Sequence, residues 1–88
     1  MIKVNKINDQ TFEVTVEDRT ATTHRVTVTP DVYDDLTGGE VSIEKLIEKS
    51  FEFLLQREPN TSILRNFDLE IIGHYFPEYK KTIRGMLQ

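Results

Sequence analysis

The sequence predicts an α+β fold in which a three-stranded antiparallel meander is followed by three to four helices packed on one of its faces. Apolar and polar residues alternate over residues 1–29, which is the period of half-buried strands. From residue 30 onward the apolar spacing becomes helical and helix-capping residues recur. Strands that come first and helices that follow are typical of α+β domains. The length of 88 residues fits one domain, 1–88, with the meander in residues 1–29 and the helical part in residues 30–88.

The first hairpin follows from the positions of its apolar residues. Pairing Val4 with Val14 puts both side chains on one face of the sheet. The same register pairs Ile2 with Val16 and leaves a short loop over residues 8–10, a length common in hairpins.

For the second hairpin we expect Val26 to lie opposite Val16, with the loop within residues 19–23. This register places Glu17 across from Arg25 as an opposite-charge pair. The meander would then have one apolar face, one polar face and two edge strands.

Two helices are expected next. Thr29 can cap a short helix that begins at Pro30 and ends at Gly38. Ser42 can cap the longest helix, which ends before Pro59 because proline lacks an amide donor. The apolar residues of this long helix cover an arc of roughly 200°, wider than an ordinary surface stripe. We therefore expect it to lie across the sheet and to be covered on a flank by later segments.

Three shorter segments complete the chain. Residues 60–62 are three potential capping residues and predict a helical turn. Asp68 can cap a short helix that Gly73 ends. Pro77 opens a C-terminal helix whose apolar residues are expected to point inward: Tyr79, Ile83, Met86 and Leu87.

Several stretches carry a resemblance that covers nearly the whole chain. They are a threonine-rich alternating start, Leu36-Thr37-Gly38-Gly39, residues 50–65 (SFEFLLQREPNTSILR), Phe67-Asp68-Leu69 and Ile72-Gly73-His74-Tyr75-Phe76-Pro77. In these stretches the chain resembles a family of small uncharacterised bacterial proteins. The resemblance implies a bacterial, single-domain, non-secreted protein. It implies no reaction and no functional residue, because no function is assigned to that family.

Composition excludes several classes of function. The chain has no cysteine, which excludes a disulfide scaffold, a thiolate nucleophile and zinc sites with sulfur ligands. No apolar stretch is long enough for a signal peptide or a membrane span, so we expect a cytoplasmic protein without membrane contact. The formal net charge is -4, and residues 1–44 carry nine acidic against four basic side chains. This acidity removes a general electrostatic attraction to nucleic acid.

No motif indicates catalysis, a cofactor or a metal. The chain has no Gly-x-Ser-x-Gly elbow and no glycine-rich nucleotide loop. Acidic residues gather around the first predicted helix, but the spacing of Asp31, Asp34, Asp35 and Glu40 matches no calcium loop. We therefore expect no catalytic, cofactor-binding or metal-binding residue and a protein that is not an enzyme. An enzyme with a site shared between subunits is a further hypothesis.

The two histidines have ordinary structural interpretations. His24 is expected at the rim of the meander, in a surface pair with Asp18. His74 has Glu70 and Glu78 four residues to either side, a spacing that resembles helical metal ligands. A glycine and a proline interrupt that segment, and two carboxylates with one imidazole make a poor transition-metal site.

The C-terminal helix carries the sharpest local feature. Lys80, Lys81 and Arg84 fall within an arc of about 100° beside the apolar stripe, and Tyr75 is near them in the sequence. These four residues are the candidate partner-binding residues. The cations could bind phosphates while the aromatic stacks on a base, or they could simply complement the helix dipole.

We expect a small binding or interaction module. Its partner would be an unknown protein, or a second copy of the chain that pairs with a free sheet edge to form a homodimer. The alternative function is a nucleic-acid-binding accessory protein that uses the basic face of the C-terminal helix.

Overall fold

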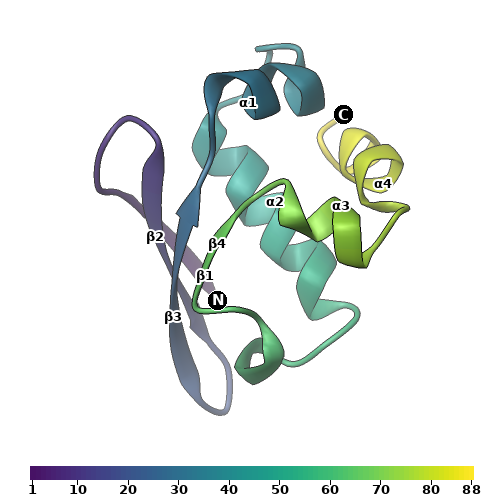
Figure 1. Cartoon of the computed structure of the whole chain (residues 1–88). Helices are drawn as coiled ribbons and strands as arrows, with labels where there is room; N and C mark the ends of the chain where they lie inside the picture. The colour runs from purple at the N-terminus through teal and green to yellow at the C-terminus, as the bar shows by residue number, and fades with distance from the viewer.

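The computed structural model describes all residues, 1–88, as a four-stranded sheet with four helices and one 3₁₀ turn. In chain order the elements are β1 (Ile2–Lys6), β2 (Thr11–Glu17), β3 (Ala21–Thr27), α1 (Pro30–Thr37), α2 (Ile43–Leu55), η1 (Asn60–Ser62), β4 (Asn66–Asp68), α3 (Ile71–Tyr75) and α4 (Tyr79–Met86). The predicted α+β class is confirmed. Figure 1 shows the sheet on one side of the molecule and the helices on the other.

The sheet is mixed, which corrects the prediction of a purely antiparallel three-stranded meander. The strand order is β1-β2-β3-β4, and β4 runs parallel to β3. Two main-chain hydrogen bonds hold the ends of this pairing: the Arg25 amide donates to the Arg65 carbonyl (2.7 Å), and the Leu69 amide donates to the Thr27 carbonyl (2.9 Å). β4 has three residues, of which only Phe67 is buried, and so short a run is too brief for its alternation to be recognised from the sequence.

The register of the first hairpin is confirmed. Val4 lies opposite Val14, and Ile2 lies opposite Val16. The Ile7 amide closes the loop with a hydrogen bond of 2.9 Å to the Thr11 carbonyl.

The predicted register of the second hairpin is wrong. Val26 lies opposite Phe12 instead of Val16, and Arg25 lies opposite Glu13 instead of Glu17. A shift by an even number of residues keeps every side chain on the same face, so alternation alone cannot separate the two registers.

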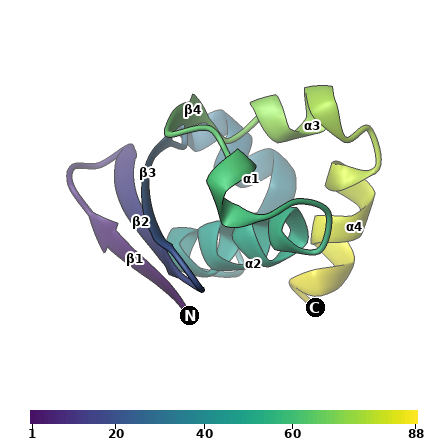
Figure 2. The same cartoon turned by 90° about the horizontal axis from the view of Figure 1, so that it is seen from below.

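α2 is the central element of the helical layer. Figure 2 shows it between the sheet and α4, and it contacts both β1 and α4. This position explains the wide apolar arc predicted for the helix, because the sheet covers one side of it and α4 covers another. The Ser42 hydroxyl caps its first turn by accepting from the Lys45 amide (3.1 Å). α2 ends at Leu55, slightly before the predicted stop.

The ends of α1 follow the sequence, whereas α3 and the start of α4 depart from it, since α4 begins at Tyr79 and not at Pro77. Thr29 caps α1, and Gly38 terminates it in the left-handed region at φ 67°, as predicted. α3 begins after Glu70, and Gly73 lies inside it, so the prediction that Asp68 caps this helix and Gly73 ends it is wrong. Asp68 is unavailable as a cap because it forms part of β4.

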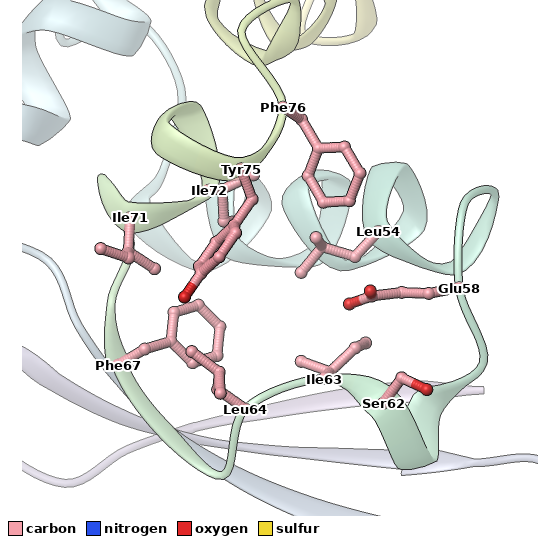
Figure 3. A pocket seen from close by; sticks show the side chains of 10 residues that line it. All are labelled: Leu54, Glu58, Ser62, Ile63, Leu64, Phe67, Ile71, Ile72, Tyr75 and Phe76. Atoms are coloured by element: carbon pink, nitrogen blue, oxygen red, sulfur yellow. The ribbon is translucent and has the colours of Figure 1, made fainter.

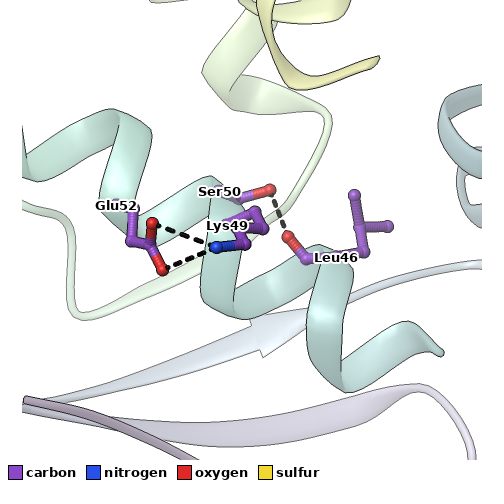
Figure 4. Close-up of polar contacts among 4 residues, drawn as sticks. All are labelled: Leu46, Lys49, Ser50 and Glu52. Carbon is purple, nitrogen blue, oxygen red and sulfur yellow. Dashed lines mark hydrogen bonds and ion pairs between the residues drawn. The ribbon is translucent and has the colours of Figure 1, made fainter. Parts of the chain in front are cut away.

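Seventeen buried hydrophobic residues form one core cluster between the sheet and the helices. Phe51 and Ile83 are completely buried in it, and Tyr79 is 2% exposed. Ser50 is buried as well, and its hydroxyl donates to the Leu46 carbonyl one turn earlier (2.7 Å; Figure 4) while lying 2.6 Å from the Tyr79 hydroxyl. None of the helices combines the length and the apolar character needed to cross a membrane.

Candidate functional site

The predicted basic face of α4 contacts α1 and is partly neutralised there. The Asp35 carboxylate of α1 forms an ion pair with Lys80 at 2.9 Å and another with Arg84 at 3.6 Å. Arg84 also donates to the Asp35 carbonyl at 2.8 Å. The hydrogen bond from Lys80, with the charges of both cations, lowers the pKa of the Asp35 carboxyl below its ordinary value. Two of the three predicted cations therefore join α4 to α1.

The four candidate partner-binding residues are divided between two helices. Lys81 is exposed on α4 and takes part in no ion pair. Tyr75 belongs to α3 and is 66% exposed. It lines an apolar pocket to which none of the three cations contributes.

This pocket, called the Glu58 pocket below, has a volume of about 350 Å³. It lies where the end of α2, η1, β4 and α3 converge (Figure 3). Eight of its ten lining residues are hydrophobic, and the two others are Glu58 and Ser62. The hydrophobic lining residues are Leu54, Ile63, Leu64, Phe67, Ile71, Ile72, Tyr75 and Phe76.

Apolar surface continues past the mouth of the Glu58 pocket. Leu64 is 48% exposed, and Tyr75 is exposed more fully still. Only four large hydrophobic side chains are exposed on the whole chain, and the other two, Met1 and Ile7, flank β1. Two of the four therefore gather at this one pocket, which makes it the main apolar feature of the surface.

Glu58 brings the only charge into the pocket. Its carboxylate points into the hollow from the end of α2 toward Leu54 and Ile63 (Figure 3). No ion pair or hydrogen bond within the protein involves this carboxylate, whose oxygens keep contact with solvent. Burial raises the pKa of Glu58 above its ordinary value, because the charged form loses hydration.

The neighbouring cation, Arg57, is engaged elsewhere. Its guanidinium lies 3.6 Å from the centre of the Phe53 ring, donates to the Phe53 carbonyl at 3.0 Å and pairs with Glu78 at 3.2 Å. The Arg57 guanidinium is therefore held by Glu78 and by the Phe53 ring, and it does not compensate the charge of Glu58.

His24 is buried on the inner face of the sheet, which corrects its predicted place in an exposed pair with Asp18. Its Nδ1–H donates to the Leu64 carbonyl at 2.8 Å, and the Thr22 hydroxyl lies 2.9 Å from Nε2. The side-chain amide of Asn60 donates to the Thr22 oxygen at 3.1 Å. This network links β3 to η1 and to the wall of the Glu58 pocket, and it explains why two polar residues of β3 can face the core.

A second surface of interest is the outer edge of β1. In this hairpin the hydrogen-bonded pairs are the odd-numbered ones, because the Glu17 amide donates to the Met1 carbonyl and the Ile7 amide to the Thr11 carbonyl. The amide and carbonyl groups of the even-numbered residues, Ile2, Val4 and Lys6, therefore point away from β2. No strand lies on that side, as Figure 2 shows.

The surface beside this edge is charged in both signs. A shallow hollow there is lined by Val4 and by four residues of α2: Glu44, Lys45, Glu48 and Lys49. Lys49 also pairs with Glu52 at 3.4 Å (Figure 4). At the other edge of the sheet the short β4 pairs with residues 25–27 of β3.

The chain places no three His, Asp or Glu side chains in an arrangement that could hold a metal ion. His74 is exposed on α3. Sequence reasoning used Glu58 only as a helix end and missed the pocket around it. The available signal was the density of apolar residues between Ile63 and Phe76, which exceeds what one short helix can bury. No family model, no curated protein and no solved structure matches this chain.

Proposed function

We propose that the protein is an interaction module without enzymatic activity that pairs with a second copy of itself through the outer edge of β1. The single observation that carries the proposal is the row of unpaired main-chain groups at Ile2, Val4 and Lys6. A free strand edge of this kind is a template for another strand.

The edge is self-complementary in an antiparallel pairing centred on Val4. Such a pairing places Val4 of one copy beside Val4 of the other and Ile2 beside Lys6. The half-buried side chains of Ile2 and Val4 would then become covered, because both lie on the inner face of the sheet. A two-fold axis at this point satisfies the symmetry of an isologous dimer.

Charge also favours a second copy. The charged row of α2 beside Val4 contains two acids and two bases, so it has no net charge and offers both signs to the same row of another copy. Complementary patches orient association and disfavour wrong partners. A partner surface with charges of only one sign would not be complementary to this row.

Sedimentation equilibrium tests the proposal. We expect a concentration-dependent mass that rises from the monomer value of 10.3 kDa toward twice that value. The double variant Glu44→Lys and Glu48→Lys makes the row entirely basic and should keep the protein monomeric. A matched variant, Lys45→Glu with Glu48→Lys, exchanges the charges while keeping their balance and should still associate. A wild type that stays at the monomer mass at millimolar concentration contradicts the proposal.

The nucleic-acid function is the alternative and receives less support. Asp35 pairs with Lys80 and Arg84, so the exposed cationic footprint is smaller than the sequence indicates. A cytoplasmic location and membership of a small bacterial protein family belong to the proposal as expectations from the sequence alone.

A further inference from the structure

We infer that the Glu58 pocket is a binding site for a small organic cation, namely a protonated amine carried on an apolar body. The inference is independent of the proposed pairing, because the pocket and the hollow beside β1 share no lining residue.

The size and shape of the pocket suit a small ligand. Its volume of about 350 Å³ lies near the lower end of the range of roughly 300–1,000 Å³ that is usual for small-molecule sites. A predominantly apolar lining with very few polar groups is the usual composition of such sites. The lining comes from segments of the chain on both sides of β4, so the hollow is a product of tertiary packing and not of one loop.

The charge of the ligand follows from Glu58. A carboxylate that is partly desolvated and lacks an internal cation is complementary to a positively charged donor. Arg57 cannot supply that donor, because it is held by Phe53 and Glu78. A neutral ligand of the same shape would lack the attraction between opposite charges, and an anionic ligand would be repelled.

The apolar body of the ligand follows from the remaining walls. Leu54, Ile63 and Ile72 offer aliphatic contact. Phe67, Tyr75 and Phe76 add aromatic rings, which bind hydrocarbon well and also attract cations over their faces. A ring or short chain that bears an ammonium group meets both requirements, with its ammonium directed to Glu58.

A titration followed by ¹H–¹⁵N NMR tests the inference with 2-phenylethylamine as the probe. We expect saturable shifts at the amides of the pocket residues. The neutral isostere 2-phenylethanol and the anion 3-phenylpropionate should bind at least about tenfold more weakly, because the alcohol lacks the positive charge of the amine and the anion is repelled by Glu58.

Three variants sharpen the test. Glu58→Gln keeps the shape of the side chain and removes its charge, and it should weaken binding of the amine by about tenfold. Glu70→Gln removes an exposed carboxylate that lies outside the pocket and should bind the amine as the wild type does. Tyr75→Ala removes an exposed aromatic wall and should weaken the amine and the alcohol together.

Three results would overturn the inference. They are equal affinity for the amine and the alcohol, unchanged binding in Glu58→Gln, and shifts that map outside the pocket or do not saturate. A short lysine-containing peptide that binds more tightly than every small amine would also overturn it, because the occupant would then be a partner protein. The mass measurements on β1 are unaffected by any of these results, so the two ideas fail separately.

Discussion

The imidazole of His24 on β3 donates to the main-chain carbonyl of Leu64, forty residues later in the chain, across 2.8 Å. Because a carbonyl only accepts, the proton of the neutral ring must be on Nδ1, and Nε2 is left to accept from Thr22. Leu64 is also a wall of the Glu58 pocket. One buried side chain therefore connects the sheet to the candidate site.

The protonation of His24 should make the protein sensitive to mild acid. Burial, above all, lowers the pKa of His24 below its ordinary value of 6.5, and the charge of Arg65 acts in the same direction. The unfolded chain therefore takes up a proton at a higher pH than the folded protein does. The free energy of unfolding should fall as the pH drops below about 6.5, and the loss should end near the depressed folded pKa.

Urea unfolding at pH 5, 6 and 7 measures this effect. We expect His24→Gln to flatten the profile between pH 7 and pH 5, although it starts from a lower stability because it disturbs the hydrogen bond to Leu64. His74→Gln removes an exposed histidine and serves as the control. A wild-type stability that rises on acidification through this range would contradict the assignment.

The ionised carboxylate of Glu58 should lower the free energy of unfolding at neutral pH. Its folded pKa is raised by burial, so the folded state favours the protonated acid. Stability contributed in this way is present at low pH and is lost as the pH rises through the folded pKa. Glu58→Gln should therefore raise the free energy of unfolding at pH 7 by up to about 1 kcal/mol, since the carboxylate keeps some exposure to solvent.

The comparison at low pH provides the control for Glu58. Below about pH 4 both states of the wild type carry the neutral acid, and the advantage of Glu58→Gln should vanish. Thermal unfolding of the two proteins at pH 7 and near pH 3.5 measures the difference. A variant that is less stable than the wild type at pH 7 would show that the carboxylate has an internal partner.

Phe51 should be the most sensitive core position. Its ring is fully buried and lies 5.4 Å from the His24 ring and 6.1 Å from the Phe67 ring, measured between centroids. Phe51→Ala should cost about 3 to 5 kcal/mol, which is close to the whole stability of a small domain. Denaturant unfolding measures it, and a cost below about 1 kcal/mol would mean that α2 does not occupy the centre of the core.

Charge reversal on α4 separates the two proposed functions. We expect the wild type to show no salt-sensitive binding of a short oligonucleotide at low ionic strength, because Asp35 neutralises part of the basic face. The variant Lys81→Glu with Arg84→Glu should leave the association of the protein with itself unchanged. Binding of the oligonucleotide that is present in the wild type and lost in this variant would favour the nucleic-acid function.

Local patterns in the sequence were enough for the first hairpin and for the caps of α1 and α2. Val4 and Val14 could be paired because alternation and a short loop leave one register. Thr29 and Ser42 were predictable as caps because the interaction spans three residues.

The remaining features depend on partners that are distant in the chain. The second hairpin was placed wrongly because the true register buries Thr22 and His24, and their partners Asn60 and Leu64 come some forty residues later. β4 escaped prediction because three residues are too few for their alternation to be recognised. At the candidate site the sequence associates Tyr75 only with the cations of the C-terminal helix, and Glu58 gains its significance only from the walls that tertiary packing builds around it.

The parallel pairing of β3 with β4 also sets an order of assembly. Thr27 and Asn66 are separated by the whole of α1 and α2, so this contact closes a long loop, whereas the two hairpins close short ones. We therefore expect the contact to form late and to open early. Amide protons of Arg25 and Leu69, which bond across this seam, should exchange with solvent together and faster than those of the β1–β2 ladder. A ligand held in the Glu58 pocket should slow that exchange, because Phe67 of β4 belongs both to the pocket wall and to the parallel pairing.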